Sequence, residues 1–264
     1  MTDGGTRPFT QVGRLTQVGR RVFAAGLASA VLSVGAAGCA SAGPTAAKTA
    51  STTAVTAANP LASLSADQIA AKAVADLRMA ASVDVVGSFT DSGQRIRLNM
   101  RLVAGKGCNS RMSFPGKGSF RLLMIGKVVW IKPNDLFWKS YGGANATVLQ
   151  LLSGKYLKTS AGSGFGALSK LCRARLLARS FPKVRGIAKG ENTVISGQPA
   201  LQLTTTGSKG TDSMYVSVSA RPQILRITAT GSDGGQLDFI GYGTAVTLTA
   251  PPASQTLDGK KYGF

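Results

Sequence analysis

The first regular pattern of apolar positions in the chain is helical. Ser65-Ala66-Asp67-Gln68 has the form of a capping box, with a hydroxyl at the cap and a glutamine three residues later. The run that follows contains no glycine or proline as far as Ala81, and its apolar residues recur at helical spacing: Ile69, Ala73, Val74, Leu77 and Ala81. This spacing predicts an amphipathic helix over 65–81.

After Ser82 the period of the pattern changes to two. Ile96, Leu98, Met100 and Leu102 alternate with Arg95, Arg97, Asn99 and Arg101, which predicts a half-buried strand. It forms a hairpin with 83–90 across the turn at 91–93. Further strands are expected at 109–114, 119–125, 128–132, 186–190, 193–196, 200–205, 213–218, 223–230 and 236–242.

Residues 133–182 interrupt the strand pattern. A short helix is expected at 147–152, a glycine-rich loop at 162–164, and a second helix at 165–180 that ends before Pro182. This helical segment divides two groups of strands. The order predicts an α+β fold with a strongly curved antiparallel sheet.

The N-terminal residues have the pattern of a secretory signal. Four arginines precede an uncharged run from Val22 to Ala37, which is about 24 Å long as a helix. A hydrocarbon layer is roughly 30 Å thick, so a permanent membrane span is the weaker interpretation.

Cys39 directly follows this signal. Ala36-Ala37-Gly38-Cys39 resembles the bacterial lipobox, in which the cysteine sulfur is acylated and the chain is cut before it. We therefore expect a signal peptide over 1–38, a flexible Ala/Thr-rich tether over 39–62 and one folded domain over 63–264. The protein would then be anchored through Cys39 to the outer face of the cell membrane. The alternative is ordinary cleavage near an incidental cysteine.

The chain is strongly basic, with 31 Lys and Arg, 11 Asp and Glu, and a net charge of +20. The basic residues are scattered along predicted strands, and the signal directs the chain out of the cytoplasm, so a nucleic-acid partner is not expected. Anionic headgroups or cell-wall polymers fit the location better. A merely solvated basic surface is the alternative.

Five segments together resemble a known family: 64–67, "GKVVWIKPNDLFWK" at 126–139, "LSGKYLKT" at 152–159, "LSKLC" at 168–172 and "VTLTAPPASQTLD" at 246–258. In this order they are similar to the actinobacterial lipoproteins of the mycobacterial LppX/LprAFG group. The resemblance covers nearly all of 63–258. It implies a LolA-like half-barrel sheet wrapped over helices, with an apolar cavity that holds lipids in transit through the envelope.

The three cysteines have two different expected roles. With Cys39 acylated, Cys108 and Cys172 remain as a pair in an exported domain, and oxidising surroundings favour a disulfide between them. Two separate buried thiols are the alternative.

No catalytic or metal site is predicted, and no cofactor. The chain has no histidine, which excludes Ser-His-Asp catalysis, Cys-His nucleophiles and most zinc sites. Ser180-Phe181-Pro182-Lys183 matches Ser-x-x-Lys, but Pro182 interrupts the helix that this motif requires. We therefore expect a protein that is not an enzyme.

The inward-facing apolar residues are the candidate ligand-binding surface. By strand parity they are Leu98, Met100, Leu122, Met124, Val129, Ile131, Val216, Val218, Leu225, Ile227, Leu237 and Phe239. Periodicity does not distinguish a lined cavity from a filled core. The preferred hypothesis is a carrier or presenter of a lipid or glycolipid, with Arg95, Arg97, Arg101 and Arg121 available at the rim to an anionic headgroup. The alternative is an envelope interaction module with protein or cell-wall partners.

Overall fold

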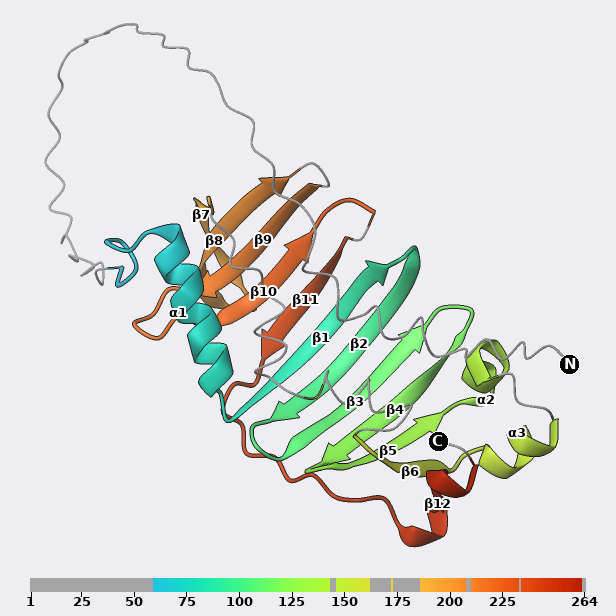
Figure 1. The fold of residues 1–264 in the computed structure, drawn as a ribbon. Coiled ribbons are helices and arrows are strands. Elements are labelled where there is room, and N and C mark those ends of the chain that lie inside the picture. Colours follow the sequence, from blue (N-terminus) through green and yellow to red (C-terminus); the bar gives the residue numbers. More distant parts are fainter. Residues whose placement is uncertain are drawn as a thin grey trace, which may run out of the picture.

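The computed structural model describes residues 59–142, 146–161, 172, 186–207, 210–232 and 234–262. Its centre is a curved, unclosed sheet of twelve strands, shown in Figure 1. The strand order is β12-β6-β5-β4-β3-β2-β1-β11-β10-β9-β8-β7, and all neighbours are antiparallel except β12 and β6. The predicted α+β class and curved antiparallel sheet are confirmed.

The strands in chain order are β1 (Ser82–Asp91), β2 (Gln94–Val103), β3 (Gly107–Phe114), β4 (Gly118–Ile125), β5 (Val128–Pro133), β6 (Tyr156–Ser160), β7 (Ala188–Ile195), β8 (Gln198–Gly207), β9 (Gly210–Ser217), β10 (Ile224–Ala229), β11 (Gly235–Ile240) and β12 (Thr256–Asp258). The helices are α1 (Ala66–Met79), α2 (Asp135–Phe137) and α3 (Ala146–Leu152), and a π-helical turn over Trp138–Gly142 follows α2. Two 3-10 turns, Ala253–Gln255 and Gly259–Tyr262, flank β12.

The capping box predicted for α1 is present. The Ser65 hydroxyl accepts a hydrogen bond from the Gln68 backbone N–H, and the Gln68 side chain accepts one from the Ser65 backbone N–H. Ile69, Ala73 and Leu77 are buried, and α1 packs against β9 and β10 (Figure 1). Leu61, two residues before the expected start of the domain at 63, is also buried in the core at 1% exposure.

The two groups of strands form one sheet because β1 pairs with β11 along six residue pairs. Gly87, in the middle of β1, has a φ of +153°. A Cβ atom there would lie 2.1 Å from the Gln236 carbonyl oxygen of β11, so only glycine permits this close contact. The joint between the two groups therefore depends on a residue without a side chain.

The segment expected to be helical contains a strand. Residues 156–160 form β6, which pairs with β5, while 146–152 is the short helix expected there. The loop expected at 162–164 and the helix expected at 165–180 lie outside the described residues. The two strands expected at 186–190 and 193–196 are a single strand, β7, whose register shifts between Lys189 and Asn192. A register shift of this kind resembles a break when only the pattern is read.

The π-helical region is fixed to β4 by one side chain. The Asn134 side-chain oxygen accepts hydrogen bonds of 2.9 Å from the backbone N–H of both Ser119 and Phe137. The Phe137 ring then packs on Phe114 and Phe120, with centroids 5.9 and 5.3 Å apart. This aromatic cluster covers one end of one face of the sheet.

Candidate functional site

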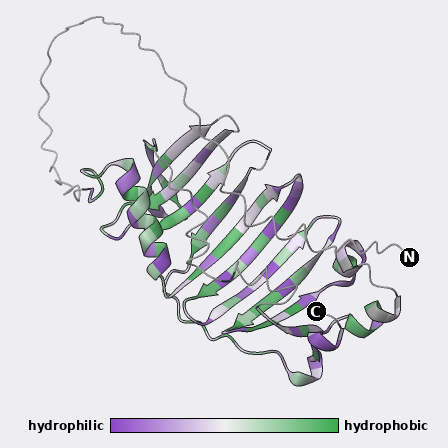
Figure 2. Ribbon diagram, in the orientation of Figure 1, coloured by the Kyte–Doolittle hydropathy of each residue, from purple (hydrophilic) through white to green (hydrophobic). Residues whose placement is uncertain are grey.

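The strands present two different faces. Figure 2 shows apolar and polar residues alternating along them. Paired residues in an antiparallel sheet share a face, so the row Met100-Ser110-Leu122-Ile131 lies on one side and the row Arg101-Asn109-Leu123-Trp130 on the other. We call the first the inner face, because α1 and the main core pack on it, and the second the outer face.

Most of the candidate lining lies on the inner face. Eight of the twelve residues are buried in the main core, and Val218, Ile227 and Leu237 are partly buried against it. The eight are Leu98, Met100, Leu122, Met124, Val129, Ile131, Val216 and Phe239. The inward parity of these positions was therefore readable from the sequence.

Leu225 is the exception. It is buried in a separate cluster with Ile195, Ala200 and the partly buried Tyr215. The register of β10 against β9 shifts between Ile224 and Arg226, so Ile224 takes the inner position in the main core instead. A bulge changes the face of a side chain without leaving a mark in the alternation.

Cys108 and Cys172 form a disulfide, with their Cα atoms 5.0 Å apart. Both are buried in the main core, and Cys108 lies on β3. The bond therefore holds Cys172 against the inner face. Cys39 and the Ser180-x-x-Lys183 motif lie outside the described residues.

The arginines expected at the cavity rim are not beside the inner face. Arg101 and Arg121 project from the outer face, and Arg95 and Arg97 lie on the same side of β2 as Arg101. Arg101 makes two hydrogen bonds to the Asp84 carboxylate across the β1–β2 pair. The hydrogen bonds and the charge of Asp84 raise the pKa of Arg101. The rim hypothesis for these four residues is therefore wrong.

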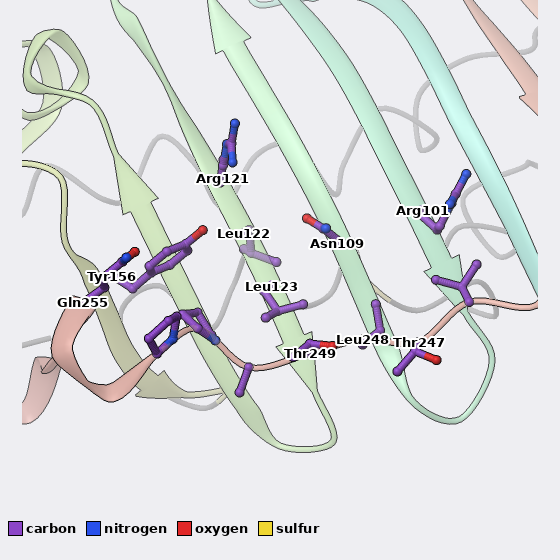
Figure 3. Close-up of a pocket in the computed structure, with 14 residues that line it drawn as sticks. Arg101, Asn109, Arg121, Leu122, Leu123, Tyr156, Thr247, Leu248, Thr249 and Gln255 are labelled. Carbon is purple, nitrogen blue, oxygen red and sulfur yellow. The ribbon is translucent and has the colours of Figure 1, made fainter.

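A cavity of about 480 Å³ lies on the outer face (Figure 3). Its floor includes Arg101, Asn109, Arg121, Leu123 and Tyr156. Its other wall is residues 246–252, part of the segment 244–252 that we call the C-terminal strap. Half of the lining residues carry hydrogen-bond donors or hydroxyl groups and half are apolar, so the cavity differs in chemistry from the predicted apolar site.

The strap is held at both ends. At its start, the Ser82 hydroxyl donates a 2.6 Å hydrogen bond to the Thr244 carbonyl. After its end, β12 pairs with β6, and the Lys155 ammonium donates to the Ser254 carbonyl at 3.2 Å. Val246 and Leu248 are partly buried, while Thr247 and Thr249 between them are exposed. The strap therefore crosses the outer face like an extended chain with an apolar side toward the sheet.

The sequence alone does not predict this cavity. The alternating arginines of β2 and β4 were visible, but nothing local indicates that residues 244–252 return across them. The resemblance segment at 246–258 was the nearest signal.

Two other observations concern what the described residues lack. None of their helices is long and apolar enough to cross a membrane. Within the same ranges, no group of three Cys, Asp or Glu side chains is placed to hold a metal ion.

No family model and no curated protein matches this chain. Among solved structures it is similar to LprF from Mycobacterium bovis, with 12% identity, 70% of this chain and 96% of that chain covered, and a TM-score of 0.47. It is similar to the lipoprotein LppX from Mycobacterium tuberculosis, with 12% identity, 70% and 98% covered, and a TM-score of 0.46. Both are members of the group that the sequence segments resemble.

Proposed function

We propose that this chain is a lipid-binding lipoprotein of a bacterial envelope that carries or presents a lipid or glycolipid. Its anchor is an acylated Cys39 on the outer side of the membrane, and its ligand's acyl chains lie on the inner face of the sheet. The lipobox and the family resemblance support the class. The main observation for the binding surface is a row of residues across six strands, in which five strands contribute an apolar side chain and β1 contributes Gly87.

This row follows the register of the sheet. It passes from Leu98 on β2 through Gly87 to Leu237 on β11, Ile227 on β10, Met214 on β9 and Leu203 on β8. Leu98 and Leu203 at its ends are buried. Leu237, Ile227 and Met214 between them are only partly buried, and we call these three the inner-face window.

The window is the part of the inner face where an apolar ligand gains most. Burying apolar surface contributes about 25 cal/mol per Å², or about 0.8 kcal/mol for each methylene of an acyl chain. Fully buried neighbours such as Met100 and Phe239 have little surface left to offer. Met214 adds an unbranched, adaptable side chain, which suits ligands of variable shape.

A pair of substitutions on β11 tests the proposal. Leu237 lies in the window, whereas Ile240 lies on the outer face in the row of Asp84 and Arg101 and is 45% exposed. The full chain is purified from its own membrane as wild type, Leu237→Glu and Ile240→Glu, and bound lipid is measured by native mass spectrometry. We expect bound lipid in wild type and Ile240→Glu, and a large loss in Leu237→Glu.

Thermal unfolding of the same samples provides the control for folding. If the folded wild type carries no lipid and takes up none, the carrier proposal is wrong, and the fold serves an interaction module instead. If both variants lose lipid equally, the ligand is not on the inner face. Mass measurement of the N-terminal peptide tests the acyl group on Cys39 separately.

A further inference from the structure

Like charges face one another on the outer face of the first group of strands. Arg111 on β3 is paired in register with Arg121 on β4, and Arg121 is paired with Lys132 on β5. Residues opposite each other on a face have close Cβ atoms, and like charges there repel. We call these three residues the basic ladder.

The basic ladder contrasts with two other arginines of the sheet, Arg101 and Arg226, which have acidic partners. Arg101 is paired with Asp84, and Arg226 donates to Asp238 at 2.5 Å. Among the described residues, neither Arg111 nor Arg121 has an acidic partner. Lys132 lies over the ring of Tyr156, with its Nζ 5.1 Å from the ring centroid, and none of the acidic residues that the structure describes forms a salt bridge with it.

The ladder borders the outer-face cavity. Arg121 and Tyr156 are part of the cavity wall, and Figure 3 shows them with Asn109 on the floor that the strap crosses. The described residues that line the cavity include no acidic residue. Its polar groups are the guanidinium of Arg121, the guanidinium of Arg101 that is bound to Asp84, side-chain amides and hydroxyls, so the chemistry favours an anion.

The size and the lining of the cavity indicate which class of anion it can bind. A guanidinium binds phosphate through two parallel hydrogen bonds, and Arg111 and Lys132 add positive charge beside Arg121 although they do not line the cavity. At about 480 Å³ the cavity is within the range of sites for small organic ligands and larger than a bare phosphate needs. Leu123, Pro251 and the Tyr156 ring offer apolar surface to an organic part.

We propose that the outer-face cavity binds a phosphate ester, with the phosphate on Arg121 and its ladder neighbours and the organic part between Tyr156 and the strap. The ester is either a soluble molecule or the headgroup of an anionic lipid. This site lies on the opposite face from the inner-face window and does not depend on the function proposed there.

The test measures binding by the full chain at 0.15 M NaCl, where the screening length is about 8 Å and diffuse attraction between exposed charges is weak. The soluble arm is calorimetric titration with glycerol 1-phosphate, with inorganic phosphate as a second probe. The membrane arm is co-sedimentation with phosphatidylglycerol vesicles, compared with phosphatidylcholine vesicles. Each arm uses wild type, Arg121→Gln and Arg97→Gln.

Arg97 is the matched control. It is an exposed outer-face arginine whose partners in register are Ser88 and Ser113, and it does not line the cavity. We expect Arg121→Gln to weaken binding by about tenfold or more, the effect of losing a hydrogen-bonded charged group, and Arg97→Gln to leave it nearly unchanged.

The two arms distinguish the sources of the phosphate. Binding of glycerol 1-phosphate that depends on Arg121 supports a soluble ester, and vesicle binding with the same dependence supports a lipid headgroup. The proposal is overturned if wild type binds none of the probes. It is also overturned if the two variants lose binding equally, because binding would then depend on the net charge of the protein and not on a specific site.

Discussion

Met100 and Arg101 are neighbours on β2, but they lie in different chemical surroundings. Met100 is 2% exposed within an apolar layer that continues across the sheet, whereas Arg101 projects from the opposite face and is paired with Asp84. Burial on the inner face is governed by the hydrophobic effect, which depends on area and not on direction. The outer face is governed by charge pairing, and in the basic ladder the pairing is missing. Changes to the two faces should therefore differ in size and in sign.

The largest loss of stability is expected when the disulfide on the inner face is removed. Cys108 and Cys172 are 64 residues apart, and closing such a loop lowers the entropy of the unfolded chain by an amount worth about 4 kcal/mol in the chain-entropy model. We expect Cys108→Ser/Cys172→Ser to lose stability of this order in urea unfolding. Cys39→Ser, which leaves the bond in place, serves as the control, and equal stability of both would contradict the role of the bond.

The next largest difference in stability is expected between alanine variants of two isoleucines on opposite faces. Ile131 on β5 is fully buried on the inner face, and Ile240 on β11 is 45% exposed on the outer face. Replacing Ile131 by alanine should cost about 2–5 kcal/mol because it leaves a cavity in a packed layer. Ile240→Ala should cost less than about 0.5 kcal/mol. Similar losses in the two variants, measured by denaturant unfolding, would show that the inner face is not the main core.

A third change affects the joint between the two groups of strands. Gly87→Ala places a methyl group against the Gln236 carbonyl, so the β1–β11 pair must shift, at a cost of about 1–3 kcal/mol. Gly93, at a turn with a φ of +75°, has no atom within 4 Å of a Cβ position. Gly93→Ala should cost only the backbone strain, and thermal unfolding would rank the two. A larger loss at Gly93 would be evidence against a tight joint at Gly87.

The strand pattern of the sequence predicts which face of the sheet each residue lies on, but not which distant strands pair with one another. Alternation placed Ile96, Leu98, Met100 and Leu102 on one side correctly, because each depends only on its neighbours in β2. The pairing of β1 with β11 joins residues about 150 positions apart in the chain, and no local signal specifies it. For the same reason the return of the strap across the outer face, and therefore the cavity beneath it, was not predictable.

Leu225 and β6 show two further limits. The bulge in β10 moves Leu225 to another cluster although its parity matches that of Ile227. Tyr156–Ser160 is a short strand that follows the helix α3, and its five residues are stable as a strand because β5 and β12 flank them. Both outcomes depend on tertiary pairing, which overrides local preference.

The smallest change in stability is expected on the outer face, where a substitution should stabilise the fold and not destabilise it. Arg121→Gln removes a charge that faces Arg111 on one side and Lys132 on the other, so without ligand it should raise stability by about 0.5 kcal/mol. Arg97→Gln, whose neighbours in register are serines, should change stability little. The difference should shrink in high salt, and a loss of stability in Arg121→Gln would mean that the arginine has a structural partner.

The most direct test of lipid on the inner face is contact quenching by brominated acyl chains. Tryptophan is introduced in two separate variants, Leu237→Trp in the inner-face window and Ile240→Trp on the outer face of the same strand, and the parent emission is subtracted. The account predicts that a phospholipid with brominated acyl chains quenches the added emission of Leu237→Trp and leaves that of Ile240→Trp unchanged. Quenching of Ile240→Trp alone, or of neither variant, would contradict it.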